Sequence, residues 1–315
     1  MGEPTRILCV VNDATLPDTL SRLFLSRDIQ VLRAESGKEA LGIARGESVA
    51  VVVAGNLLPE MRGVELLSQI RDLSPNTVRV LLAGHTDLPA AIEATHRGVA
   101  SRFLEEPWVE EEIFRTVEGG VRRYQVIRSL RHADEAALLW IAQEIELKDP
   151  YTRGHCDRVA AAALKIAGAL RLPEGTLRAI KHGSWLHDCG KIDVPEGILN
   201  YPGKLSTADF EVIKKHPGWG AEIGRQANLP EEVINIILHH HERFDGKGYP
   251  TGAKGTEIPL EARIVAVADV FDAMSGDRPY AKGYDREEAM RVMGVLREAA
   301  LDPRLVDLLL ANLTP

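Results

Sequence analysis

The sequence predicts two folds in one chain: an α/β domain built on a five-stranded parallel sheet, followed by an all-α helical bundle. Short runs rich in β-branched residues alternate with helical periods from Arg6 to about Pro107, whereas almost no strand-like alternation follows Asp149. The chain of 315 residues is long enough for two domains, each with its own hydrophobic core.

The N-terminal part contains five strand-then-helix units, each about 20 residues long. Such units predict a parallel sheet with helices on both faces. The expected strands are Ile7–Val11, Ile29–Ala34, Val49–Ala54, Thr77–Leu82 and Ala100–Leu104, and the helices are expected to begin near Leu16, Gly37, Gly63, Leu88 and Trp108.

A connecting helix is predicted between the two domains. Neither Pro nor Gly occurs between Val121 and Leu147, and apolar residues recur mostly three or four positions apart. This apolar stripe is expected to pair with the same stripe of a second chain in a homodimer, and the alternative is that it packs on its own domain. The predicted boundaries are 1–118 for the α/β domain, 119–147 for the connecting helix and 148–315 for the bundle.

The remaining chain reads as a series of helices. Asp149 and Pro150 are typical of an N-cap followed by the first helical position. Helices are expected at about Tyr151–Leu170, Glu174–Asp188, Thr207–Lys215, Gly218–Gln226, Glu231–His241, Leu260–Met274 and Arg286–Ala299.

Composition excludes several classes of protein. The formal net charge of -8 argues against binding to a nucleic-acid polymer or an acidic membrane, because both favour a basic surface. No apolar run approaches the 18 residues of a membrane span, and no signal peptide is recognisable. Three scattered cysteines do not form a disulfide framework, so the predicted location is the cytoplasm.

The strongest chemical signal is the adjacent pair His187 and Asp188. Such a pair can ligate a divalent metal, and the two Asp oxygens can bridge to a second ion. Alone the pair is a weak signal, but other residues of metal-binding type occur along the bundle: His155, His216, His239, His240, His241 and Asp269. Asp269 follows an apolar helical run, where a buried carboxylate is costly unless it meets a cation.

The N-terminal part resembles the receiver domain of two-component response regulators, a flavodoxin-like fold. The resemblance rests on the loop Leu58–Gly63 and on Glu106-Pro107-Trp108. Gly55 stands where a receiver has its phosphoacceptor Asp. Ala83 stands where a receiver has a Thr or Ser, and Glu106 stands where it has a Lys. We therefore expect a pseudo-receiver that cannot be phosphorylated and serves as a docking, dimerising or small-ligand surface; the alternative is a scaffold only.

The C-terminal half resembles the HD-GYP family, the metal-dependent cyclic di-GMP phosphodiesterases of bacteria, whose bundle belongs to the HD superfamily. The matching residues are His187-Asp188, Tyr201–Leu205, His216, His240–Pro250, Ala262–Ile264, Asp269, Asp272 and Asp277–Tyr280. The resemblance implies that one metal takes His155, His187, Asp188 and Asp269, and the other takes Asp188 as bridge with His216, His240 and His241. It leaves His239 outside the site, and Tyr151 stands where some members use a Glu to bind a third metal.

The same resemblance assigns further roles. Lys191 and Arg278 are expected to place positive charge around the substrate phosphates, and Tyr249 is expected to contact the nucleotide unless its Gly-Tyr-Pro turn only shapes a loop. Asp149 is expected to assist proton transfer or position substrate, with helix capping as the alternative. Glu242 and Asp245 are expected to hold ligand histidines.

The predicted function is hydrolysis of cyclic di-GMP to linear pGpG, and on to GMP, in bacterial signalling. Asp188, Lys191 and Asp149 are the catalytic candidates, and the predicted cofactors are two divalent ions, iron first, then manganese, with nickel or zinc as alternatives. Two other interpretations stay open. One is hydrolysis of another cyclic dinucleotide, and the other is a module that binds nucleotide or partner signalling proteins without turnover.

Overall fold

The computed structural model describes residues 4–12, 14–25, 27–146, 154–275, 284, 286–297 and 299–313. The chain divides into two compact units, Met1–Ile127 and Arg128–Pro315. Within the described residues, no helix combines the length and apolarity needed to cross a membrane.

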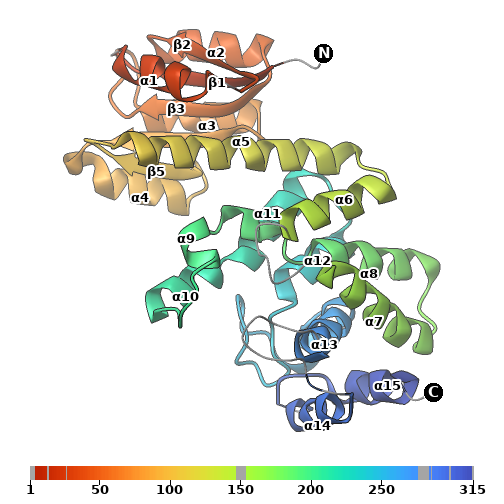
Figure 1. Cartoon of the computed structure of the whole chain (residues 1–315). Coiled ribbons are helices and arrows are strands. Elements are labelled where there is room, and N and C mark those ends of the chain that lie inside the picture. Colours follow the sequence, from red (N-terminus) through yellow and green to blue (C-terminus); the bar gives the residue numbers. More distant parts are fainter. Residues whose placement is uncertain are drawn as a thin grey trace. The chain divides into compact units, whose positions relative to one another are not determined.

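The first unit is a five-stranded parallel sheet in the order β2-β1-β3-β4-β5, which confirms the predicted fold (Figure 1). Its strands are β1 (Thr5–Val10), β2 (Ile29–Ala34), β3 (Val49–Gly55), β4 (Val78–Ala83) and β5 (Arg102–Glu105). β3 is the central strand of the sheet. Every residue from Val49 to Ala54 is buried, as expected for an apolar strand that is covered on both faces.

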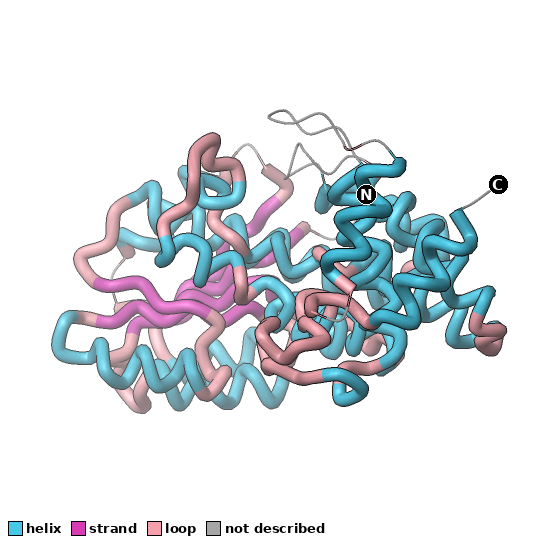
Figure 2. The backbone as a smooth tube through the Cα atoms, turned by 90° about the horizontal axis from the view of Figure 1, so that it is seen from below, coloured by secondary structure: helices cyan, strands magenta, loops and turns pink. Residues whose placement is uncertain are grey.

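Helices cover both faces of this sheet (Figure 2). α1 (Thr15–Leu23) and the first half of α5 (Glu110–His132) bury apolar residues on one face, for example Leu20 and Ile113. α2 (Gly37–Gly46), α3 (Gly63–Leu73) and α4 (Leu88–His96) cover the other face, with residues such as Leu66 and Ala91, and the short η1 (His85–Asp87) precedes α4.

The predicted single connecting helix is wrong, because residues 121–147 do not form one element. α5 ends at His132 and α6 (Glu135–Glu146) begins three residues later. Asp134 explains the break, since its Oδ1 accepts a hydrogen bond from the backbone N–H of Ala137, 2.9 Å away, as an N-cap does. Of the stripe residues, Val121 is buried in the core of the first unit.

The second unit is all helical, which confirms the predicted class. After α6, its elements are α7 (His155–Ala169), α8 (Glu174–Leu186), η2 (Cys189–Asp193), α9 (Glu196–Leu199), α10 (Thr207–Ile213), α11 (His216–Gln226), α12 (Glu231–His239), η3 (Gly255–Glu257), α13 (Leu260–Ser275), α14 (Arg286–Leu296) and α15 (Pro303–Leu313). α9 and α15 were not predicted. Asp302 followed by Pro303 is the sequence signal for α15, and Asp302 Oδ1 accepts from the backbone N–H of Arg304 at its start.

α13 runs through the core of this unit. Every residue from Ile264 to Ala268 is buried, in one cluster with residues of α7, α12 and α15. A helix that is apolar on all sides is stable only when neighbours surround it. The core therefore holds Asp269, the next residue along α13, at a fixed place among the other helices.

Candidate metal centre

The structure gathers two groups of potential metal ligands in the second unit, and Asp188 belongs to both. One group contains Asp188, His216, His240 and His241, and the other contains His155, His187 and Asp188. In each group the ligand atoms lie within 4.8 Å of one another. These residues lie on α7 and α11, directly after α12, and between α8 and η2, so only the folded bundle brings them together.

The two carboxylate oxygens of Asp188 point toward different groups. Oδ1 lies 3.3 Å from Nε2 of His216 and 3.9 Å from Nε2 of His240. Oδ2 lies 3.5 Å from Nε2 of His187 and 2.7 Å from Nζ of Lys191. A carboxylate in this position is suited to bridge two cations, one on each side.

Helix ends orient three of the histidines. Nδ1 of His187, His216 and His240 donates to the carbonyl oxygen of the residue three positions earlier, Ser184 at 2.7 Å, Ile213 at 2.8 Å and Ile237 at 2.9 Å. These carbonyls lie in the last turns of α8, α10 and α12, where backbone oxygens lack a partner within the helix. With Nδ1 as donor, each neutral ring presents Nε2 as a lone pair toward the centre of the site.

A carboxylate orients the fourth histidine, His155. Its Nδ1 lies 2.7 Å from Oδ2 of Asp272, and its Nε2 lies 3.1 Å from Oδ1 of Asp269. Asp272 is also bonded by Arg158, whose Nε lies 2.7 Å from Oδ1. Asp269 Oδ1 also lies 4.0 Å from Nε2 of His187. The carboxylate on α13 is therefore close to the imidazoles of both His155 and His187.

The electrostatics of the site match a set of metal ligands. Burial opposes the charge of Asp188, but Lys191 and His187 outweigh it and hold the pKa of the carboxyl well below its usual range. Burial, assisted by neighbouring imidazoles, holds the pKa of His240 well below its usual range. Burial also lowers the pKa of His241 to about 4. At neutral pH Asp188 is therefore ionised and both histidines are neutral, as metal ligation requires.

His155 behaves differently. Burial alone would lower its pKa, but hydrogen bonds to the Asp269 and Asp272 carboxylates outweigh burial and raise the pKa to about 10. Without metal the ring is therefore protonated at neutral pH, and a cation must displace this proton to bind there.

One contact tests whether the donor set fits a metal. Nε2 of His216 and Nε2 of His240 lie 3.2 Å apart, while Nδ1 of each ring is committed to a carbonyl. Two neutral rings arranged this way aim lone pairs at each other, which is unfavourable without a shared proton or cation. The imidazole and carboxylate ligands are the types that bind first-row transition metals, so the residues present fit such an ion.

Polar and aromatic groups lie beside the candidate ligands. The Tyr249 ring lies 4.9 Å from the His241 ring, and Lys214 Nζ lies 5.6 Å from the centre of the Tyr249 ring. Burial, with the Asp188 and Asp269 charges, raises the pKa of the Tyr249 phenol, which stays a hydrogen-bond donor. Glu242 holds this loop, since its Oε1 accepts from both N and Oγ1 of Thr251 at 2.7 Å.

His239 is in neither group, in line with its predicted place outside the site; its Nδ1 donates to the carbonyl of Asn235 at 3.0 Å. Asp245 was expected to hold a ligand histidine. Its Oδ2 instead lies 2.7 Å from Nη2 of Arg243, and no contact with a ligand histidine is found within the described part of the chain. Asp149, Tyr151 and Arg278 lie outside the described residues.

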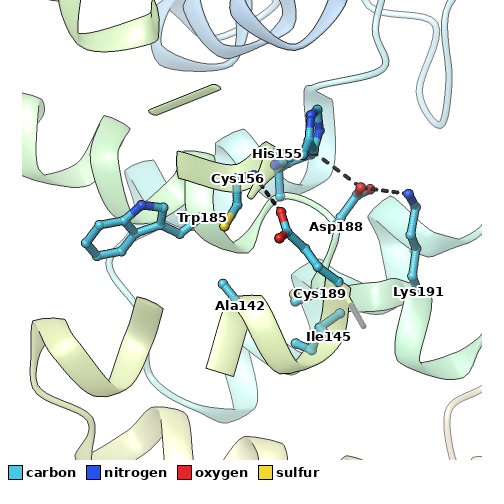
Figure 3. Close-up of a pocket in the computed structure, with 10 residues that line it drawn as sticks. Ala142, Ile145, His155, Cys156, Trp185, Asp188, Cys189 and Lys191 are labelled. Carbon is cyan, nitrogen blue, oxygen red and sulfur yellow. Dashed lines mark hydrogen bonds and ion pairs between the residues drawn. The ribbon is translucent and has the colours of Figure 1, made fainter. Parts of the chain in front are cut away.

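Sequence reasoning missed Lys214 and Arg158, and it missed the three carbonyls that orient the histidines. The spacing of three residues between each carbonyl and its histidine, together with a helix end, was the available signal. A small cavity adjoins the ligands, lined by His155, Asp188 and Lys191 together with Ala142 and Ile145 of α6 (Figure 3).

This fold and site agree with comparisons to known families. The HD domain matches residues 140–305, and the response regulator receiver domain matches residues 7–118. The chain therefore belongs to the HD domain family and carries a response regulator receiver domain ahead of it.

Similar proteins are named as phosphodiesterases of cyclic dinucleotides. A cyclic di-GMP phosphodiesterase of Thermotoga maritima is 30% identical over 96% of this chain and 88% of that protein. The cyclic di-GMP phosphodiesterase response regulator RpfG of Xanthomonas campestris pv. campestris is 33% identical over 86% of this chain and 78% of that protein. A 3'3'-cGAMP-specific phosphodiesterase 2 of Vibrio cholerae is 34% identical over 58% of this chain and 35% of that protein.

Proposed function

We propose that this chain is an HD-GYP cyclic di-GMP phosphodiesterase that uses two divalent ions to hydrolyse cyclic di-GMP to linear pGpG. The observation that carries the proposal is the placement of Asp188, whose two oxygens face separate groups of imidazoles 3.3 and 3.5 Å away. The proposed ligands are His155, His187, Asp188 and Asp269 for one ion, and Asp188, His216, His240 and His241 for the other.

The chemistry divides between the ions and the chain. Two such ions, when bound, supply Lewis-acid activation of water and neutralise charge on a phosphodiester. Lys191 Nζ, held 2.7 Å from Asp188, adds a fixed positive charge beside the position of the scissile phosphate. Tyr249 offers an aromatic face and a phenol O–H to the nucleotide, and Lys214 adds a second cation close to that ring.

The protein also keeps its ligands in the required states. Asp272 holds the Nδ1 proton of His155, and the helix carbonyls hold those of His187, His216 and His240. Every Nε2 is then directed into the site before substrate arrives. We propose that Asp149 and Arg278, which lie outside the described residues, act on the proton and the phosphates as the sequence predicts.

A substrate assay tests the proposal. Full-length protein loaded anaerobically with Fe²⁺ or Mn²⁺ is incubated with cyclic di-GMP or with 3'3'-cGAMP, and the products are separated by chromatography, with a chelator-treated sample as control. We expect pGpG from cyclic di-GMP and no product after chelation. Binding of cyclic di-GMP without any linear product would instead establish a binding module.

The second candidate substrate is 3'3'-cGAMP. It is favoured by two relatives of Vibrio cholerae named for that specificity, which are 34% identical over 58% of this chain and 35% identical over 50% of it. Faster turnover of 3'3'-cGAMP than of cyclic di-GMP in the same assay would assign that substrate.

We further propose that the N-terminal domain, residues 1–118, is a pseudo-receiver. Gly55 ends β3 where a receiver has its phosphoacceptor, and a glycine has no group to phosphorylate. Homodimer formation through the segment 119–147 and a cytoplasmic location also stay proposals. Light scattering of the full chain tests the first, and fractionation of the source cells tests the second.

A further inference from the structure

A buried carboxylate outside the ligand set contacts the backbone on both sides of His155. Glu146 is the last residue of α6 and is 9% exposed. It accepts from the backbone N–H of Cys156 at 2.5 Å and from that of Gly154 at 2.9 Å. The two amides that it binds belong to the residues immediately before and after the ligand.

These amides need an acceptor that the local sequence does not supply. They lie at the N-terminus of α7, where backbone N–H groups have no partner within the helix. The N-cap is Gly154, at a φ of 71°, and it has no side chain to cap with. The carboxylate of the preceding helix fills this role, and its negative charge is favoured at a helix N-terminus.

α6 is itself part of the site's wall. Ala142 and Ile145 line the same cavity as His155, His187 and Asp188, and both are buried. A shift of α6 therefore moves Glu146 and, through two hydrogen bonds, the first turn of α7. His155 is the first residue of that turn, while Asp272 on α13 holds its ring from the other side.

We propose that Glu146 is the positioning residue that couples α6 to the metal position formed by His155, His187 and Asp269. The inference rests on the proposed two-metal site. It concerns this metal position in particular, because Glu146 accepts from the backbone at the start of α7, whereas His216 begins α11 and His240 and His241 follow α12.

The experiment measures the affinity for each ion in the full chain. Mn²⁺ is titrated into chelator-stripped wild type and variants, with competition by a chelator to resolve two binding steps. In Glu146→Ala we expect one step to weaken by about 10- to 100-fold, as for loss of a group that orients a ligand, and the other to stay within about twofold. Glu146→Gln keeps one acceptor oxygen but loses the charge, so we expect an intermediate loss.

Two controls separate positioning from general destabilisation. Glu144→Ala removes an exposed carboxylate from the same turn of α6 and should leave both steps unchanged. Hydrogen exchange of the Cys156 amide should accelerate in Glu146→Ala even when chemical denaturation shows a folded chain. If Glu146→Ala does not fold, Glu146→Gln and Glu146→Asp carry the test.

The outcomes are distinct from those of the proposed function. Wild type that binds two ions, together with a Glu146→Ala or Glu146→Gln variant that binds both unchanged or loses both equally, overturns the coupling and leaves the metal site intact. Wild type that binds no ion overturns the metal site and the coupling with it.

Discussion

Oδ1 of Asp188 lies 3.3 Å from Nε2 of His216, although the two residues are 28 positions apart and belong to different elements. The other oxygen of the same carboxylate faces His187 and Lys191. The two candidate ion positions therefore share one side chain, and changes to Asp188 should affect both.

Asp188→Ala should abolish binding of both ions and all turnover, because the proposed bridge is gone. His216→Ala should remove one ion and spare the other. Metal analysis of both purified variants by mass spectrometry, reported as ions per chain, checks this. Two ions per chain in Asp188→Ala would exclude the bridging assignment.

The three consecutive histidines should separate into one bystander and two ligands. His239→Ala should retain two ions and wild-type turnover, since its ring binds the Asn235 carbonyl and is in neither group. His240→Ala should lose one ion and lower kcat by at least about 100-fold, the scale of loss expected when a group that stabilises the transition state is removed. Loss of an ion in His239→Ala would show that His239 is itself a ligand and would overturn this division.

Metal binding should release protons, and His155 is the main source. Its pKa of about 10 in the metal-free chain lies above its ordinary value of 6.5, so the ring is protonated at pH 8 and must lose that proton to a cation. Titration calorimetry in two buffers of different ionisation enthalpy should show about one proton released per chain at pH 8, with affinity rising with pH. Binding that shows no buffer dependence would contradict this.

The same shift sets the direction of the stability profile of the metal-free chain. Folding raises the pKa of His155, so its protonated ring stabilises the folded state. This contribution is complete below pH 6.5, the pKa in the unfolded chain, and is lost as the pH rises through about 10. Chelator-treated protein should therefore become less stable to denaturant between pH 7 and pH 10. His155→Gln should flatten this part of the profile, whereas the exposed His85→Gln should leave it unchanged.

Replacement by alanine should have very different effects at two glycines of the bundle. A Cβ at Gly190 would lie 1.9 Å from the backbone oxygen of His216 and 2.5 Å from the backbone nitrogen of Gly220, whereas a Cβ at Gly197 meets nothing within 4 Å. Gly190→Ala should cost about 3 kcal/mol in the free energy of unfolding and weaken metal binding, because the backbone that carries His216 must move. Gly197→Ala should stay within about 1 kcal/mol of wild type. Denaturant unfolding of the two variants measures the difference.

Acetyl phosphate should leave the N-terminal domain unmodified. In the proposed pseudo-receiver, Gly55 stands at the acceptor position. A Cβ at Gly55 would meet neighbours only at 3.8 Å, so Gly55→Asp is a comparison variant whose first side-chain atom fits. Intact-mass spectrometry of the wild type should show no added phosphoryl group. A phosphorylated residue in 1–118 of the wild type would refute the pseudo-receiver proposal.

Periodicity and turn residues were enough to predict the α/β domain, since β3 and β4 are local buried runs and every strand lies within a few residues of its expected position. The break between α5 and α6 was missed because nothing in 121–147 is a strong helix breaker, and the N-cap by Asp134 becomes visible only with its bond to Ala137. The ligand types and their order along the chain were likewise apparent, because imidazoles next to carboxylates in an apolar setting are costly without a cation.

What the sequence by itself determined is the kind of structure in each half and the identity of the metal-binding candidates, because these depend on side-chain chemistry and on contacts between near neighbours. Only the tertiary structure decided that Asp188 faces two groups, that helix-end carbonyls and Asp272 orient the imidazoles, and that Glu146 reaches the backbone around His155. Each of these relations depends on the distance between atoms on separate helices. That distance is set by how the whole bundle packs around α13, and no local pattern of residues encodes it.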